Sequence, residues 1–170
     1  IDLSGRQVAQ GNAIIEKMGL KNVRLEEKDI LTIDESFGKF DYIIVHGIWS
    51  WVPDTVKDKI FSICRNNLTE HGIAYISYNV YPGWKRSEQI REIMLFSSSG
   101  IQMESLASRT RKGLDTVNAL AEILEGDKGI KNNEKLQSMR NVLGKNGYYV
   151  AHEYMEAFND PIYVNGFIEW

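Results

Sequence analysis

Acidic residues and a histidine stand where a chain of alternating strands and helices would bind a ligand. Asp2 precedes a predicted helix, Asp29 follows a short alternating stretch, and His46-Gly47 follows the β-rich stretch 40–45. Parallel α/β sheets bind ligands outside the carboxyl ends of their strands. A carboxylate there can accept hydrogen bonds from ribose hydroxyls or from an adenine amine. Asp2 equally suits helix capping, and a lone histidine is more often structural. The three positions therefore indicate a ligand site only when they are taken together.

Aromatic residues concentrate in two loops that follow predicted strands. Trp49 and Trp51 stand in the first loop, and residues 78–84 read Tyr-Asn-Val-Tyr-Pro-Gly-Trp. Aromatic rings form apolar walls with polar tips and bind cations on their faces, while the amide of Asn79 supplies one acceptor and two donors. The second loop therefore suits a positively charged or amine-bearing substrate. The alternatives are a hydrophobic lid for the first loop and an inter-domain hinge for the second.

The stretches that must position these residues alternate between strand and helix patterns. Four stretches are β-rich and predict strands: residues 1–3, 23–27, 40–45 and 73–78. Ser4 is a predicted N-cap, Pro53 a predicted first helical residue, and His71-Gly72 a predicted turn before the last strand. The order β-α-β-β-α-β predicts a parallel α/β sheet, with the stretch 40–45 apolar enough to be buried.

Beyond Trp84 the pattern changes to helical spacing. Apolar residues recur on one face in three stretches, around Ile90, Leu114 and Leu136, and an aromatic-rich tail follows from Tyr148. The stretch also carries interleaved charges of both signs, as solvated helix surfaces do. We therefore expect a second module from residue 85, in which His152-Glu153 is a structural rather than a catalytic pair.

Composition excludes several classes of protein. The 170 residues are 43% hydrophobic with a net charge of −3, which argues against a disordered chain and against a dedicated nucleic-acid binder. The apolar runs are too short for a membrane span. The single cysteine, Cys64, fits a reducing cytoplasm, and no zinc-ligand spacing, nucleophile elbow or glycine-rich phosphate loop occurs, so we expect no metal.

These residues resemble a class I S-adenosylmethionine-dependent methyltransferase that carries a methyltransferase regulatory domain. The run Tyr-Asn-x-Tyr-Pro-Gly-Trp is the most specific part. Further matching positions are residues 1–4, 7, 11–12, 19–20, 22–23, 29–30, 40–44, 46–47, 50–53 and 72–77, with 152–154 and 159–163 in the tail. The resemblance implies an α/β fold, with a partial Rossmann-like methyltransferase sheet in residues 1–84 and a mostly α-helical dimerisation or regulatory region in residues 85–170.

The resemblance also implies roles for individual residues. The cofactor would be S-adenosylmethionine, and catalysis would rest on orientation by Tyr78 and Asn79. The positions implied to bind the cofactor are Asp2, Leu3, Asp29, Ile30, His46 and Gly47. The positions implied to face the substrate are Trp51, Tyr81 and Trp84.

The family includes bacterial protein lysine methyltransferases that act on outer-membrane proteins, so the resemblance implies methyl transfer to protein lysines in the cytoplasm. A small-molecule methyltransferase and a non-catalytic dimerisation or interaction fragment remain alternatives, and a homodimer is one expected assembly. In the family, a strand and a glycine-rich turn precede the ribose-binding acid, whereas this sequence opens at Ile1. We therefore expect the chain to be incomplete for activity at both ends.

Overall fold

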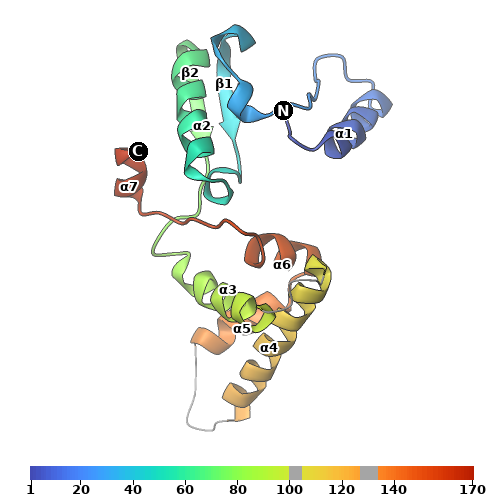
Figure 1. Ribbon diagram of the computed structural model, residues 1–170, viewed down its shortest axis with the longest axis vertical. Helices are drawn as coiled ribbons and strands as arrows, with labels where there is room; N and C mark the ends of the chain where they lie inside the picture. Colours follow the sequence, from blue (N-terminus) through green and yellow to red (C-terminus); the bar gives the residue numbers. More distant parts are fainter. Residues whose placement is uncertain (100–104, 127–133) are drawn as a thin grey trace. The chain divides into compact units, whose positions relative to one another are not determined.

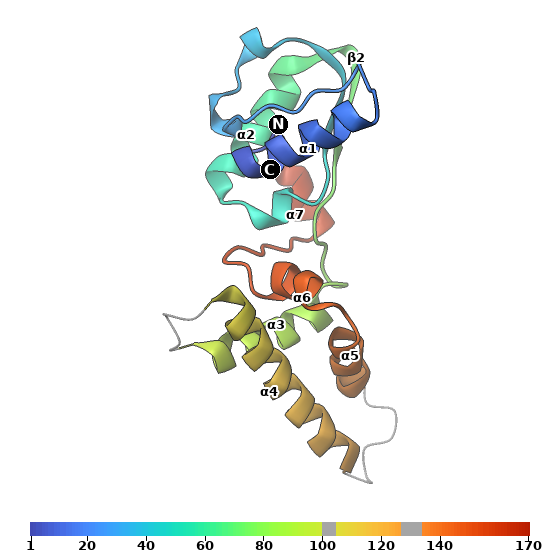
Figure 2. The same cartoon turned by 90° about the vertical axis from the view of Figure 1, so that its right-hand side faces the viewer.

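The computed structural model describes residues 1–99, 105–126 and 134–170, shown as a ribbon in Figures 1 and 2. Internal contacts divide the chain into two compact units, Ile1–Ser77 and Tyr78–Trp170. The domain assignment 1–84 and 85–170 stays a prediction. Within the described ranges, no helix is long and apolar enough to cross a membrane.

Both units are built from short elements joined by short connections. The first unit contains α1 (Gly5–Lys17), η1 (Ile30–Thr32), η2 (Glu35–Phe37), β1 (Phe40–Val45), η3 (Trp49–Trp51), α2 (Asp54–Asn67) and β2 (Leu68–Ile76). The second unit contains α3 (Lys85–Ser98), α4 (Leu106–Gly126), α5 (Glu134–Leu143), α6 (Gly147–Tyr154) and α7 (Val164–Glu169). The fold is therefore mixed α/β, with the strands in the first unit.

The two strands pair in parallel, and α2 makes the crossover between them. Tyr42 pairs with Ile73 and Val45 with Ile76. Successive side chains of a strand point to opposite faces. In Figure 1 the helix α2 lies beside the pair, and its Ile60 is buried. Val45 is 7% exposed, whereas Ile44 is 70% exposed, so the expected burial of the whole stretch 40–45 is wrong for one face. On that face Tyr42 and Ile44 are largely exposed, and Phe40 packs against Phe37 of η2.

The predicted first strands are reduced to one bridge. Asp2 pairs in parallel with Glu27 through two backbone hydrogen bonds, from the Asp2 N–H to the Glu26 carbonyl and from the Lys28 N–H to the Asp2 carbonyl. The predicted strand 23–27 is otherwise irregular. It is held to α1 by Asn12, whose side chain exchanges hydrogen bonds with the backbone of residue 25 at 3.1 and 3.2 Å.

The last predicted strand begins earlier and ends earlier than expected. His71-Gly72 lies inside β2, where the register jumps from Phe40↔Leu68 to Tyr42↔Ile73. The irregularity brings Gly72 so close to β1 that a Cβ there would lie 3.0 Å from the Phe40 carbonyl oxygen. A bulge of this kind depends on the partner strand and leaves only a turn-like local signal.

The helix starts follow local capping rules. Ser4 is the N-cap of α1, as predicted, and its hydroxyl accepts the N–H of Gln7 at 3.4 Å. Pro53 is the N-cap of α2 rather than its first residue. The shift by one position keeps the fixed φ of proline at the helix entrance.

The second unit has a helical core, as the spacing of its apolar residues predicts. A cluster of buried side chains joins α3, α4, α5, α6 and the residue after α6: Ile90, Met94, Val117, Ala121, Met139, Val142, Val150, Tyr154 and Met155. At the crossing of α3 and α4, Gly113 packs on Met94, and a Cβ on Gly113 would lie 2.9–3.2 Å from three Met94 carbons.

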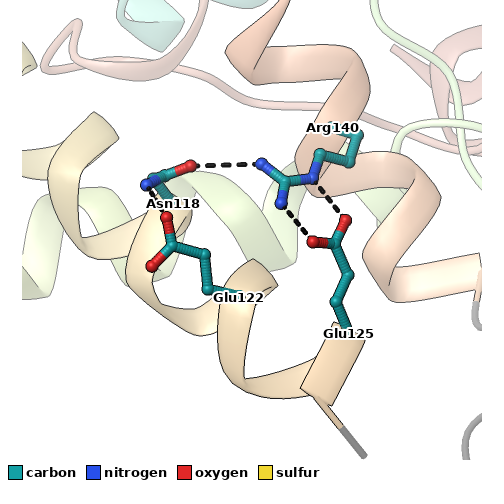
Figure 3. Close-up of polar contacts among 4 residues, drawn as sticks. All are labelled: Asn118, Glu122, Glu125 and Arg140. Carbon is teal, nitrogen blue, oxygen red and sulfur yellow. Dashed lines mark hydrogen bonds and ion pairs between the residues drawn. The ribbon is translucent and has the colours of Figure 1, made fainter.

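A polar network joins α4 to α5 beside that core. Figure 3 shows Arg140 of α5 donating two hydrogen bonds to the Glu125 carboxylate, at 2.8 and 2.6 Å, and a third to Asn118 at 3.1 Å. Asn118 in turn donates to Glu122 at 2.7 Å. The guanidinium holds the pKa of Glu125 below its ordinary value, chiefly through these hydrogen bonds. The bidentate pair therefore fixes the register of α5 against α4.

Candidate functional site

The predicted nucleotide-binding positions of the first unit border one apolar pocket. Ile1 and Ile30 line it, together with the side of β1 and Ile48, and it has a volume of about 260 Å³. Asp2, Asp29 and His46 each neighbour a lining residue in the chain. The backbone pairing of Asp2 with Glu27 brings the first two positions together. Leu3 does not line the pocket and is 73% exposed.

Asp2 and Asp29 have the same local geometry. The Asp2 Oδ1 accepts the N–H of Ser4 at 2.7 Å, and the Asp29 Oδ1 accepts the N–H of Leu31 at 2.9 Å. Each bond fixes the carboxylate at the start of a helical turn and uses one of about four acceptor sites on a carboxylate. Asp29 therefore caps η1, whereas Asp2 binds the backbone of Ser4, which is itself the N-cap of α1, and both carboxylates keep acceptor sites for a ligand.

Ser77 joins the ends of the two parallel strands. Its hydroxyl oxygen accepts the Gly47 N–H at 2.7 Å and lies 3.2 Å from Nδ1 of His46. The Ser77 hydroxyl therefore contacts both the backbone of Gly47 and the ring of His46, and which of the two atoms donates in the second contact depends on the imidazole tautomer. The ring of His46 also stacks on Tyr75, with centroids 6.0 Å apart. Both interactions fix the histidine at the carboxyl end of β1.

The tryptophan loop does bind a cation, but the cation is part of the chain. Trp49 is fully buried, and Nζ of Lys57 lies 4.8 Å from the centroid of one of its rings. Lys57 is 1% exposed and also donates to Asp54 at 3.0 Å. Trp49 therefore anchors η3 on α2. Trp51 is half-buried in the same turn, and its substrate role stays a prediction.

Residues 78–84 do not form an isolated loop. Val80 forms a parallel bridge with Ile162, in which the Tyr81 N–H donates to the Ile162 carbonyl and the Ile162 N–H donates to the Asn79 carbonyl, both at 3.1 Å. The ring of Tyr78 stacks on Phe167 with centroids 4.0 Å apart and planes at 13°. This loop therefore has a fixed shape within the second unit.

Tyr81 belongs to a charged cluster at the start of α3. Its hydroxyl donates to Glu88 at 2.5 Å, and Lys85 donates to the other oxygen of Glu88 at 2.9 Å. Nζ of Lys85 lies 4.2 Å from the centroid of the Tyr81 ring. Burial, followed by the bond to Glu88, raises the pKa of Tyr81, and the bonds from Tyr81 and Lys85 lower the pKa of Glu88. The cluster shows that this ring can hold an ammonium group.

Trp84, the remaining aromatic position, has a structural role through its backbone. Trp84 is half-buried and is the N-cap of α3, and its N–H donates to the Val80 carbonyl at 3.1 Å.

Cys64 lies inside α2, where burial raises the pKa of its thiol, as expected for a cysteine with no catalytic use. His152 pairs with Glu156 on the outer face of α6 at 3.4 Å.

The predicted site residues form two groups, each within one unit. In the first unit Ile30 lines the pocket, and Asp2, Asp29, His46 and Gly47 each neighbour a lining residue in the chain. Tyr78, Asn79 and Tyr81 share the loop of the second unit. Sequence reasoning missed the residues that position them, namely Ser77, Glu88, Asn159 and Phe167. Glu88 alone had a local signal, since it stands three residues after Lys85 on a predicted helix.

Comparisons with known proteins identify the family of the chain. The family described as "Methyltransferase domain" matches residues 1–110. Two proteins of Rickettsia prowazekii, RP789 and RP028, are 39% and 37% identical to the chain over 169 residues. The chain spans 30% of the length of RP789 and 67% of the length of RP028. A Synechocystis protein, sll1526, is 28% identical over 154 residues.

Solved structures extend the likeness to the whole chain. PKMT2 from Rickettsia typhi is 34% identical and covers 99% of the chain with a TM-score of 0.82, while the chain spans 31% of PKMT2. The complex of PKMT2 with AdoHcy gives a TM-score of 0.81. Since the family match covers well over half of the residues, the chain belongs to the methyltransferase domain family.

Proposed function

We propose that this chain is part of an enzyme that transfers a methyl group from S-adenosylmethionine to lysine side chains of a protein. The observation that carries the proposal is the likeness to PKMT2, whose name denotes a protein lysine methyltransferase and which was solved with AdoHcy, the demethylated form of that cofactor. The likeness extends over both units of the chain, including the aromatic loop 78–84.

The residues around the pocket of the first unit fit the nucleoside part of that cofactor. The walls of the pocket are apolar, as the faces of an adenine ring require, and Ile30 would pack on the ring. The fixed carboxylates of Asp2 and Asp29 would accept from the ribose hydroxyls and from the adenine amine. His46 and Gly47 would lie near the methionine portion, and Leu3 would adjoin the ribose.

The aromatic residues would prepare the acceptor amine. A lysine must lose its proton before it can attack, which costs about 4–5 kcal/mol at neutral pH from a reference pKa near 10.4. An aromatic wall desolvates the amine and lowers that cost, and Tyr78 and Asn79 would orient its lone pair. Tyr81 and Trp84 would add to this wall, and Trp51 stays a predicted substrate-facing residue of the first unit. When bound, the cofactor would supply an electrophilic methyl group with S-adenosylhomocysteine as the leaving group. Because the lysine proton can pass to solvent and alignment of the amine can lower the barrier by up to ~7–11 kcal/mol, no dedicated general base is required.

Other parts of the proposal rest on the resemblance alone. The proposed compartment is the cytoplasm, the proposed acceptor class includes outer-membrane proteins, and a homodimer is the proposed assembly. A small-molecule acceptor would contradict the protein-substrate part and leave the cofactor part intact.

The cofactor part is tested by calorimetric titration with S-adenosylhomocysteine. We expect binding by the unaltered protein and a weakening of about tenfold or more in Asp2→Asn, because a hydrogen bond to a charged acceptor is worth roughly 1.5–3 kcal/mol. Asp41→Asn is the matched control, since the Asp41 carboxylate accepts from Thr69 at 2.9 Å and does not line the pocket. Equal affinity in Asp2→Asn, or no binding to any variant, would contradict the assignment.

A further inference from the structure

Four consecutive residues of the aromatic loop contact one segment near the end of the chain. Tyr78 stacks on Phe167, and Asn79 donates from Nδ2 to Oδ1 of Asn159 at 3.2 Å. Val80 forms the bridge with Ile162. The Tyr81 and Tyr163 rings lie 5.3 Å apart at an interplanar angle of 47°. Residues 159–167, named here the clamp segment, therefore contact every residue from 78 to 81.

The clamp segment fixes backbone as well as side chains. The carbonyl of Asn79 and the N–H of Tyr81 are both bound by the backbone of Ile162 at 3.1 Å. These bonds hold the peptide groups on either side of Val80, whose own side chain is 40% exposed. The orientation of the Asn79 side chain is thus set from two directions, by its own backbone and by Asn159.

The stretch that leads into the clamp segment is itself anchored to the helical core. Arg91 of α3 donates to the carbonyls of Tyr154 and Glu156, at 2.9 and 2.7 Å. Tyr154 and Met155 are buried in the core cluster. The burial of Arg91 lowers its pKa from the ordinary value, as expected for a guanidinium that is used inside the fold. The chain therefore leaves α6 in a fixed direction toward residue 159.

We infer that Asn159 and Phe167 are positioning residues for methyl transfer, because they hold Asn79 and Tyr78 in the orientation that aims the acceptor amine. The inference rests on the proposed function and adds to it a second segment of the acceptor site. Asn159 acts through Asn79. Phe167 acts through Tyr78, because its ring stacks on one face of the Tyr78 ring. Neither residue needs to touch the substrate.

The side chain of Asn159 allows a sharp pair of variants. Its Oδ1 accepts from Asn79, whereas its Nδ2 is buried and has no hydrogen-bond partner among the residues that the structure describes. Asn159→Asp keeps the accepting oxygen and loses no hydrogen bond. Asn159→Ala removes the acceptor. The first variant should therefore retain the orientation of Asn79, and the second should lose it.

Phe167 has an equally close control in the same helix. Ile168 is the next residue of α7 and is 76% exposed. Phe167→Ala removes the stack on Tyr78, and Phe167→Tyr keeps an aromatic ring there. Ile168→Ala also truncates an apolar side chain of α7, but at an exposed position. A general effect of truncating side chains on α7 would appear in both alanine variants.

The test combines steady-state kinetics with hydrogen exchange on the protein that carries this chain. We expect Asn159→Ala and Phe167→Ala to lower kcat for the protein acceptor by on the order of tenfold to a hundredfold. The affinity for S-adenosylhomocysteine should stay unchanged. The amide of Tyr81, which donates to Ile162, should exchange faster in Phe167→Ala. Asn159→Asp, Phe167→Tyr and Ile168→Ala should behave like the unaltered protein.

The outcomes separate this inference from the proposed function. If the unaltered protein transfers no methyl group to lysine, the proposed function is wrong, and exchange at Tyr81 alone then decides whether the clamp exists. If the unaltered protein is active and both alanine variants keep its kcat, the positioning role is overturned. Equal loss in Ile168→Ala and Phe167→Ala would also overturn it, since the effect would then come from α7 as a whole.

Discussion

At the scale of single residues, the candidate site depends on side chains that orient the predicted catalytic and binding residues. Ser77 bridges His46 and Gly47 across the ends of two strands. Asn159 does the same for Asn79, and Glu88 for Tyr81. In each case a residue predicted from its type is oriented by one that was not predicted, and only Glu88 has a local signal, its spacing of three residues from Lys85.

Gly47 gives the clearest prediction at this scale. Its φ of +66° lies in the left-handed region, and a Cβ there would meet no atom within 4 Å, so the cost of Gly47→Ala is conformational alone. We expect Gly47→Ala to lower the free energy of unfolding by about 1–2 kcal/mol in urea denaturation. Gly147→Ala is the control, since the same open space surrounds a glycine without positive φ. Equal stability of both variants would contradict the strained turn.

The Tyr81–Glu88–Lys85 cluster predicts a pH dependence. The hydrogen bonds from Tyr81 and Lys85 lower the folded-state pKa of Glu88 from its ordinary 4.5. A lowered carboxylate pKa contributes stability that is present above the unfolded value and is lost as pH falls through the folded value. When the pH is lowered below about 4.5, the thermal midpoint should decrease in both proteins. We expect this decrease to be smaller in Glu88→Gln than in the unaltered protein.

The control for that measurement is Glu92→Gln, a change at an exposed position on the same helix. It should leave the acid-induced loss of stability as it is. A Glu88→Gln profile that follows the unaltered protein over the whole acid range would show that the cluster does not stabilise the fold.

Local signals were enough to predict some residues but not their partners. Ser4 was predicted as a cap because capping needs only the next turn of helix, and Asp2 and Asp29 because they follow strands. The partners were missed because the contacts span long separations: His46 and Ser77 stand 31 residues apart, and Asn79 and Asn159 stand 80 apart. No pattern in one sequence marks such pairs.

At the scale of elements, packing between helices decides stability in the second unit. Alanine normally stabilises a helix interior relative to glycine by about 1 kcal/mol. At Gly113 the added Cβ would lie 3.0 Å from the Met94 Cβ, which cannot swing away as the end of a flexible side chain can. The close crossing of α3 and α4 therefore requires glycine at this position.

Gly113→Ala should accordingly destabilise the protein, against the usual helix propensity. Overpacking a close contact costs roughly 1–3 kcal/mol, so we expect a net loss of about 1 kcal/mol in chemical denaturation. Gly126→Ala, at the last residue of the same helix, meets no atom within 4 Å and should be neutral or slightly stabilising. A gain in stability from Gly113→Ala would show that the helices separate without cost.

The elements that were predicted well are those defined by their own residues. β1 matches the predicted stretch 40–45 because its β-branched and aromatic residues are contiguous, and α3, α4 and α5 follow their predicted apolar spacing. The helices α6 and α7 lie in the stretch that was expected only as an aromatic-rich tail. The start of β2 was missed because residues 68–72 pair only through a bulge against β1. The predicted strand 23–27 has apolar alternation but makes a single bridge.

At the scale of the whole molecule, the chain belongs to a family and forms part of the length of its relatives. It spans 30% of RP789 and 31% of PKMT2, yet it matches PKMT2 over 99% of its own residues. Both units are therefore shared with a protein solved with AdoHcy. The assignment of the pocket to the cofactor and of the aromatic loop to the acceptor stays a proposal.

The most direct test of the account is transfer of a labelled methyl group from S-adenosylmethionine to a lysine-rich protein, followed by hydrolysis to amino acids. The account predicts label in methylated lysine, and none when the acceptor's lysines have been chemically blocked. The same assay with Asn79→Ala should show a strongly reduced rate. Label that appears only in small molecules, or no transfer by a protein that binds S-adenosylhomocysteine, would contradict the central claim.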